Sequence, residues 1–391
     1  MAICEPTETT MMKRGHLTFE LTTSALCDLD CSYCFEGAKT NPKRLDDLDI
    51  LIKRINETLD SEWTQKYYSG VQLSFWGGEP TLNYNYIIRL MKEFEQDERV
   101  SFHIYSNGFN RKNWEKLIAG IDPSKLEVQI SYDGKPIGDI FRVTNNGKPT
   151  SDIVLKNFDW FTSINFKSLY FKSTVPSKSI PNLYKTWLEF EQLHSRYVER
   201  DNLRISFAPT LDYSMTPRDE DERNSKIDIF KEQMLLIAKK EIEFYKKYGR
   251  HLCTWFAAGD SKVNCSAGMN MVAVDVDGKT YACHGTLYTP DKDLMRSSSI
   301  FDDDFVEKIS KFNDSFVPSV TSKNPICESC VATTCLICPV ASYELSKEKD
   351  FFSRWGDKQI NGICSFYQTF GKIDRTVQNH LLESRYELQG E

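Results

Sequence analysis

The sequence lacks several features that would place it at a membrane, outside the cell or on a nucleic acid. No run approaches about 18 uninterrupted apolar residues, and residues 1–15 contain no apolar segment like that of a secretory signal. Basic residues do not predominate, since 49 Lys and Arg stand against 56 Asp and Glu and give a formal net charge of −7. Without a cationic surface, binding to a phosphate backbone is not expected. We therefore expect a cytoplasmic protein with no nucleic-acid and no membrane partner.

Histidine is scarce and cysteine is unevenly placed. The six histidines show no metal-binding spacing. The chain has 12 cysteines, yet none lies between Cys34 and Cys253. Because the cytosol keeps thiols reduced, so many cysteines indicate metal binding rather than disulfides. The gap separates an early group from a late group, which predicts metal binding at two places.

Short apolar runs alternate with amphipathic helical stretches between residues 16 and about 210. Each run is nearly continuous in apolar character, which is typical of parallel strands covered on both faces. The expected strands are 17–21, 71–76, 102–105, 126–131, 169–175 and 203–207. The expected helices are 45–59, 84–94, 112–117, 153–161 and 183–190. This pattern predicts an α/β fold of βα repeats around a parallel sheet, either open or closed, with functional residues where the strands end.

The rest of the chain is expected to form a helical bridge and a cysteine-rich module. A long charged helical pattern spans 219–248, and the cysteines become dense after it. Asp277-Gly278 predicts a hairpin turn between strands at 271–276 and 279–283. The predicted divisions are a tail at 1–15, the βα-repeat domain at 16–215, the bridge at 216–252 and a small α+β domain with a C-terminal helix at 253–391.

The early cysteines Cys27, Cys31 and Cys34 follow the first expected strand with C-x3-C-x2-C spacing. Structural zinc sites use four protein ligands, and a [4Fe–4S] cluster is normally held by four thiolates. Three thiolates would leave one iron open to a small molecule. A zinc site completed from a distant part of the chain, or three separate thiols, are the alternatives.

Small and polar residues follow the later strands. The second strand ends in Trp76-Gly77-Gly78-Glu79-Pro80, the third in Ser106-Asn107-Gly108, and the fourth in Ser131-Tyr132-Asp133-Gly134 with Arg142 soon after. Each segment alone is typical of a turn. Together with the cysteine loop they indicate a polar rim around an open iron, in which paired glycines let the backbone approach a ligand closely.

These motifs resemble those of radical S-adenosylmethionine (SAM) enzymes over roughly residues 16–210. The resemblance rests on Cys27, Cys31 and Cys34 with Tyr33 before the last cysteine, and on the Gly-Gly-Glu-Pro segment after the second strand. It implies a partial (β/α)6 barrel and a [4Fe–4S] cluster whose fourth iron is chelated by the amine and carboxylate of SAM. The cofactor-binding positions that it implies are Gly77, Gly78, Glu79, Pro80, Ser106, Asn107, Ser131, Asp133, Arg142 and Thr174.

The late cysteines resemble those of the SPASM extension, a module that binds two auxiliary [4Fe–4S] clusters. By this resemblance the inner cluster takes Cys265, Cys283 and Cys338, with Cys253 as the candidate fourth ligand. The outer cluster takes Cys327, Cys330, Cys335 and Cys364. The central block has x4 and x2 spacings where x5 and x3 are usual, which leaves open which cluster Cys335 and Cys338 serve. A zinc ribbon is the alternative, since C-x2-C pairs also bind zinc.

The resemblance implies a radical SAM/SPASM oxidoreductase that modifies a peptide or protein. The expected product is a thioether or carbon–carbon crosslink in a ribosomally made peptide, with a flavodoxin or ferredoxin as electron donor. About 16 residues precede the first strand, so a separate protein could bind a leader peptide. A sulfatase-maturase-like Cys or Ser dehydrogenase, an enzyme acting on a small metabolite, and a non-catalytic metal-binding scaffold are the alternatives. His284, directly after Cys283, is the candidate catalytic base.

Overall fold

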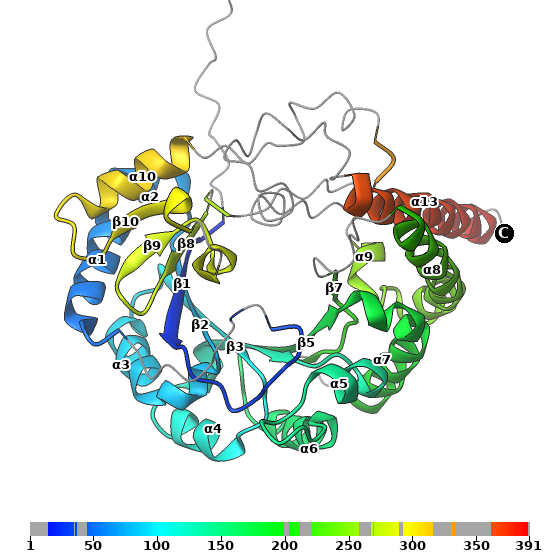
Figure 1. The fold of residues 1–391 in the computed structure, drawn as a ribbon, viewed down its shortest axis with the longest axis horizontal. Coiled ribbons are helices and arrows are strands. Elements are labelled where there is room, and N and C mark those ends of the chain that lie inside the picture. The colour runs from blue at the N-terminus through cyan, green and yellow to red at the C-terminus, as the bar shows by residue number, and fades with distance from the viewer. Residues whose placement is uncertain are drawn as a thin grey trace, which may run out of the picture.

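The fold is built on a curved sheet whose helices lie around its outer side, as Figure 1 shows. The computed structural model describes residues 15–34, 36, 45–198, 203–211, 220–257, 267–268, 270–288, 292–315, 330–332 and 361–389. The strands are β1 Leu17–Ser24, β2 Val71–Gly77, β3 Val100–Ser106, β4 Leu126–Ser131, β5 Ser168–Val175, β6 Leu203–Arg204, β7 Pro209–Leu211, β8 Met271–Val274, β9 Lys279–Tyr281 and β10 Arg296–Ser299. The α-helices are α1 Leu48–Asp60, α2 Glu62–Tyr67, α3 Tyr84–Phe94, α4 Arg111–Ile118, α5 Lys135–Phe141, α6 Ser151–Phe161, α7 Leu183–Tyr197, α8 Glu220–Tyr248, α9 Thr254–Ala257, α10 Phe305–Ser315 and α13 Asn361–Gln389. Short 3-10 helices include η1 Pro80–Asn83, η3 Ser177–Asn182 and η5 His284–Tyr288.

Strands β1 to β6 pair side by side in sequence order, and all of these pairs are parallel. Each of the six expected strands is therefore confirmed, and the parallel βα-repeat fold with it. The sixth strand is shorter than expected, since β6 spans only two residues. The chain then forms β7, which pairs with the C-terminal half of β5. The helices α2, α5, α9 and α10 and the strands β7 and β10 were not predicted.

The hairpin after residue 270 extends the same sheet rather than starting a separate one. β8 pairs in parallel with β1, with Thr18 opposite Met271, and β9 and β10 continue antiparallel from it. The predicted turn is confirmed, since Gly278 has a φ of 77°, and a Cβ there would lie 2.7 Å from the Phe301 ring. The module expected to begin at 253 thus contributes one edge of the barrel wall, seen beside β1 in Figure 1.

The two faces of the sheet differ in chemistry. On β1, Leu17, Phe19 and Leu21 pack beneath the helices in the main core, while Glu20 and Thr22 alternate with them and face the barrel interior. A similar alternation runs through β2 to β5, whose aliphatic and Phe residues also belong to this core. The opposite faces of the strands line the interior with polar side chains and with the rings of Trp76, Tyr105 and Tyr170.

The charged helix expected at 219–248 is present as α8, and it packs against α13 at the other edge of the barrel (Figure 1). No helix among the described residues is long and apolar enough to cross a membrane.

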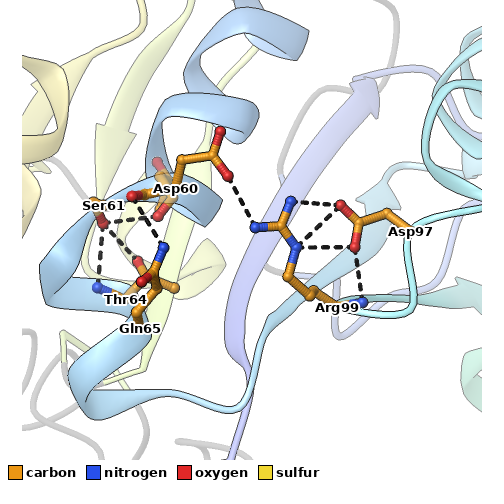
Figure 2. Close-up of polar contacts among 7 residues, drawn as sticks. Asp60, Ser61, Thr64, Gln65, Asp97 and Arg99 are labelled. Atoms are coloured by element: carbon orange, nitrogen blue, oxygen red, sulfur yellow. Dashed lines mark hydrogen bonds and ion pairs between the residues drawn. The ribbon is translucent and has the colours of Figure 1, made fainter.

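The amino ends of the strands are tied together at the surface. Arg99, just before β3, donates to both carboxylate oxygens of Asp97 and bonds Asp60 at the end of α1 at 2.9 Å (Figure 2). These side chains are substantially exposed, so the pairs stabilise the fold by about 1 kcal/mol or less each. They lie at the opposite ends of the strands from the polar rim.

Candidate active site

The early cysteines lie on the loop that follows β1, and all three are partly exposed. The loop is fastened to the chain just after α5: Asp30 N donates to Val143 O at 2.8 Å and Ser32 N donates to Phe141 O at 3.0 Å. No three His, Cys, Asp or Glu side chains among the described residues surround a single metal ion. Each thiolate of an iron–sulfur cluster binds a different iron, so its ligands are spread more widely than those of one ion.

Paired glycines bring the end of β2 against the start of this loop. Gly78 N donates to Ser24 O at 2.9 Å, and Glu79 N donates to Leu26 O at 2.7 Å. A Cβ on Gly77 would lie 2.2 Å from Ser24 O, and one on Gly78 would lie 2.2 Å from Leu26 O. Gly77 also has a φ of 134°, which side-chain-bearing residues avoid. The glycines are needed here because the two backbones are in contact.

The Glu79 carboxylate is buried and joins the ends of β2 and β3. Its Oε1 accepts hydrogen bonds from Thr81 N, Thr81 Oγ1 and Ser106 Oγ, and its Oε2 accepts one from Asn107 N at 2.8 Å. Burial, together with the nearby Asp28 carboxylate, raises the pKa of Glu79 to about 7. Pro80 follows at the first position of η1, which the Glu79 side chain caps.

Asp28 brings a second carboxylate to Glu79 from within the cysteine loop. Asn107 Nδ2 donates to Asp28 Oδ1 at 2.7 Å and lies 3.8 Å from Cys27 Sγ. Asp28 Oδ2 is buried and has no hydrogen-bond partner among the described residues. Two adjacent carboxylates, one with an unpaired buried oxygen, are a setting that a bound cation would stabilise.

Tyr33 connects the cysteine loop to the end of β4. Its hydroxyl donates to Asp133 Oδ2 at 2.5 Å and accepts from Arg142 Nη1 at 2.8 Å. Asp133 Oδ1 in turn accepts from Thr174 N on β5 at 2.8 Å. Arg142 is almost fully buried, and its Nε has no hydrogen-bond partner among the described residues. An unpaired buried guanidinium nitrogen is suited to an anion.

These residues fit the cofactor that the sequence implies. The amine of SAM is a cation, which matches the carboxylates of Asp28 and Glu79, and its carboxylate matches the unpaired Arg142 Nε. Ser131 lies at the end of β4 on the partly exposed inner face. Three thiols with no disulfide between them stand at the same rim.

His284 reaches the barrel interior from the end of the β8–β9 hairpin. Its backbone N donates to Glu20 Oε2 at 2.9 Å, and its ring Nδ1 lies 2.5 Å from the same oxygen. Its ring lies against that of Trp76, with 4.2 Å between the centroids. Burial disfavours a charged ring, but the Glu20 carboxylate outweighs it and raises the pKa of His284. His284, directly after Cys283, is thereby fixed by contacts with β1 and β2.

The stack continues across the interior to β5. Trp76 meets Tyr105 edge to face with 5.0 Å between centroids, and Tyr105 meets His103 in the same way at 4.3 Å. His103 Nε2 lies 2.9 Å from Tyr170 Oη. The barrel interior below the polar rim is therefore lined by aromatic rings, and the fully buried carboxylate of Glu20 lies beside them.

The late cysteines are described only in part. Cys265, Cys327, Cys335 and Cys338 lie outside the described residues, and of Cys364 only the backbone in α13 is described. Gly268 N donates to Ala282 O at 3.0 Å, so the chain that follows Cys265 lies next to Cys283. Gln368 Nε2 lies 3.8 Å from Cys330 Sγ, and Cys364 is one helical turn before Gln368.

Cys253 stands apart from Cys283 in the strand order. It pairs with Phe207 beyond β6, whereas Cys283 follows β9 at the other side of β1. Cys253 is fully buried, and burial raises the pKa of its thiol well above the ordinary range. Its role as a cluster ligand stays a prediction.

Two contributors to the site were not predicted from the sequence, Glu20 and Asp28. Asp28 could have been found from its place between two cysteines of a motif. Glu20 could have been found as a carboxylate within a mainly apolar strand. Neither signal shows what the residue faces until the strands are paired.

The fold and rim define a partial barrel with a loop of three cysteines after its first strand. Residues 21–176 match the Radical SAM superfamily. An uncharacterised protein of Methanocaldococcus jannaschii is 30% identical over 171 residues, 43% of this chain and 55% of that protein. The chain thus spans about half the length of that relative.

The chain is also similar to a second curated protein and to two solved structures. A cysteine-type anaerobic sulfatase-maturating enzyme of Clostridium novyi is 24% identical over 280 residues, 66% of this chain and 71% of that enzyme. The structure of anSMEcpe with bound AdoMet superposes with a TM-score of 0.65 at 18% identity and covers 94% of this chain and 100% of that one. Streptococcus suis SuiB bound to the precursor peptide SuiA gives a TM-score of 0.57 at 15% identity, over 89% of this chain and 76% of that one. At these identities the structural likenesses establish the fold.

Proposed function

We propose that the chain is a radical SAM oxidoreductase that oxidises a residue of a peptide or protein. The product we favour is a thioether or carbon–carbon crosslink in a ribosomally made peptide. The observation that carries the proposal is the rim itself, where three thiols on one loop adjoin Asp28 Oδ2 and Arg142 Nε, neither of which has a partner among the described residues. That set matches a cluster with an open iron and an amino-acid group that binds to it.

Bound there, the cluster and SAM would supply a carbon radical able to remove a hydrogen atom from the substrate. Glu79 and Asp28 would orient the amine, and Arg142 with Ser131 would orient the carboxylate. Tyr33, Asp133 and Thr174 would hold the cysteine loop against β4 and β5. Gly77, Gly78, Pro80, Ser106 and Asn107 would shape the same rim through their backbone and side-chain contacts.

His284 is our candidate for the group that takes a proton during substrate oxidation. The support is its position, since its ring lies on Trp76 at the inner end of the rim and is fixed by Glu20. Its place next to Cys283 also brings it close to the inner auxiliary cluster that we propose.

Two auxiliary [4Fe–4S] clusters would accept the electron left after hydrogen removal. The contact between the chain after Cys265 and Ala282 supports a cluster shared by Cys265 and Cys283, completed by Cys338 and by Cys253 as fourth ligand. The proximity of Cys330 to the Cys364 face of α13 supports an outer cluster shared by these two with Cys327 and Cys335. A reduced flavodoxin or ferredoxin would supply the first electron in a cytoplasmic setting, and a separate protein could deliver the peptide.

A second candidate is a Cys or Ser dehydrogenase that acts on a sulfatase. The relative from Clostridium novyi favours it, since that protein is a cysteine-type sulfatase-maturating enzyme. anSMEcpe has been solved with bound AdoMet and a Cp18Cys peptide, which favours a peptide segment as substrate in either case.

The test is mass spectrometry of a candidate peptide or sulfatase co-expressed with the enzyme. A loss of two hydrogens per modification supports the proposal, and the position of the change distinguishes a crosslink from an oxidised Cys or Ser. Formation of 5′-deoxyadenosine by the dithionite-reduced protein removes the scaffold alternative. A protein that binds zinc and forms no 5′-deoxyadenosine would refute the proposal.

A further inference from the structure

The inner face of β4 and β5 is reached by solvent. Along β5, residues buried beneath the helices alternate strictly with partly exposed ones, and β4 shows the same alternation. Leu169, Phe171 and Val175 belong to the buried set and to the main core. The partly exposed set therefore faces the barrel interior, which must contain water on this side.

Lys172 places a positively charged side chain on this inner face. It lies opposite Ser131 in the β4–β5 register, and Tyr132 N donates to its carbonyl at 2.9 Å, so it stands at the level where β4 ends. Thr174, two residues further on the same face, holds Asp133. Lys172 is therefore at the inner edge of the rim that we assign to the cofactor.

The Lys172 ammonium has no ion pair or hydrogen bond to any described residue, in contrast with its neighbour Lys167. Lys167, just before β5, pairs with Glu127 at 2.8 Å. Burial lowers the pKa of Lys172, and no carboxylate offsets that effect. Glu20, the fully buried carboxylate on β1, contacts His284 through Oε2 and forms no ion pair with Lys172, although its Oε1 has no hydrogen-bond partner among the described residues. A partly buried cation without a counter-ion, on a wetted wall, is suited to an anionic ligand.

We propose that Lys172 binds a carboxylate of the peptide substrate, from an acidic side chain next to the modified residue or from the peptide's C-terminus. This inference rests on the proposed function, because it names the substrate class of the same site. The other carboxylate available there is that of SAM, for which Arg142 Nε is already placed. Lys172 lies level with Ser131 at the inner edge of that rim. The peptide is the source we favour, because Arg142 and Ser131 already serve the carboxylate of SAM in the proposed site.

The test is selection from a displayed library of random octapeptides, half with free C-termini and half amidated, on the anaerobic SAM-bound enzyme. Lys172→Met removes the charge and keeps the aliphatic stem, while Lys172→Arg keeps the charge. Lys167→Met is the matched control, since that lysine already has a partner. The affinity of each variant for SAM is measured in parallel by calorimetry.

We expect the wild type to enrich acidic or free-acid peptides about tenfold over their neutral counterparts, as one charge-assisted hydrogen bond would. Lys172→Met should abolish this enrichment, whereas Lys172→Arg and Lys167→Met should retain it. Absence of enrichment by the wild type, or its persistence in Lys172→Met, overturns the inference. Weakened SAM binding in Lys172→Met with unchanged peptide selection also overturns it and assigns the lysine to the cofactor. Formation of 5′-deoxyadenosine by the same wild-type preparation tests the proposed function separately.

Discussion

The cysteine loop after β1 and the turn at Cys253 are two opposite environments for a thiol. The loop cysteines are partly exposed and surrounded by polar groups, two of which, Asp28 Oδ2 and Arg142 Nε, lack a partner among the described residues. Cys253 is fully buried in the core. Its turn is fixed by the buried carboxylate of Glu241, which accepts from Cys253 N at 2.7 Å and from three other donors, Trp187 Nε1, Leu252 N and His251 Nδ1.

The loop has buried polar atoms that a ligand would satisfy, whereas the backbone at Cys253 is held by the chain's own hydrogen bonds. Buried polar atoms without partners are costly, and proteins keep them where a ligand satisfies them. At Cys253 every acceptor position of Glu241 is used, so the turn holds its shape through the chain's own contacts. We therefore expect the loop cysteines to govern SAM cleavage, and the Glu241 contacts to govern the stability of the turn at Cys253.

The largest effect is expected for Cys31→Ala. Removing one of three thiolates should abolish formation of 5′-deoxyadenosine to the level seen without enzyme, because the cluster loses a ligand that no neighbour replaces. Cys253→Ala is the matched control and should keep this activity. The measurement is chromatographic quantification after dithionite reduction. Equal formation of 5′-deoxyadenosine by Cys31→Ala and Cys253→Ala would show that the loop cysteine matters no more for SAM cleavage than Cys253 does.

Glu241→Gln should strongly destabilise the fold. An amide in place of the carboxylate leaves buried donors facing an N–H group, so the free energy of unfolding should fall by about 2–3 kcal/mol. Urea unfolding followed by circular dichroism measures the change. Glu243→Gln is the control, since Glu243 is exposed and pairs only with Lys240 at 2.7 Å. A loss no larger than in the control would show that Glu241 does not fix the turn.

Tyr33→Phe should weaken SAM binding by about tenfold without unfolding the protein, because Arg142 and Asp133 each lose a hydrogen bond to the phenol. Calorimetric titration of the anaerobic protein gives the dissociation constant. Tyr132→Phe is the matched control, since that hydroxyl bonds Glu189 instead. Unchanged affinity in Tyr33→Phe would mean that the clamp does not order the cofactor site.

The smallest effect is a fraction of a proton released when SAM binds. The pKa of Glu79 is raised from 4.5 to about 7, so the folded protein holds this proton more tightly than the unfolded chain. The stability that this protonation contributes is present below pH 4.5 and is lost as the pH rises through 7. A bound ammonium favours the carboxylate, so binding near pH 7 should release up to about half a proton.

Titrations in phosphate and Tris, which differ in ionisation enthalpy, measure that proton. The heats should differ for the wild type and agree for Glu79→Gln. Equal heats for the wild type in both buffers would show that the SAM ammonium does not bind next to Glu79.

The strands and the parallel fold were predictable because short strand-like segments alternate with amphipathic helical ones. The expectation of nearly continuous apolar strands was wrong for β4, where Leu126, Val128 and Ile130 alternate with polar residues. The helix α5 was missed because Lys135-Pro-Ile-Gly is short and rich in residues typical of turns. The pairing of β8 with β1 joins residues about 250 positions apart, and no local pattern encodes it.

The candidate site was likewise predictable from the sequence only in part. The residue types at the strand ends indicated a polar rim, but the contacts between Tyr33, Asp133 and Arg142 required the folded loop. Likewise, the sequence indicated that Gly77 and Gly78 approach a ligand, whereas the structure shows that they also approach the backbone at Ser24 and Leu26.

The account depends on an iron site held by only three protein thiolates and open to SAM. Electron–nuclear double resonance on the reduced protein with ¹⁵N-labelled SAM tests it most directly. A ¹⁵N coupling to the cluster in the wild type is predicted. No coupling, or a protein side chain on the fourth iron, would contradict the account.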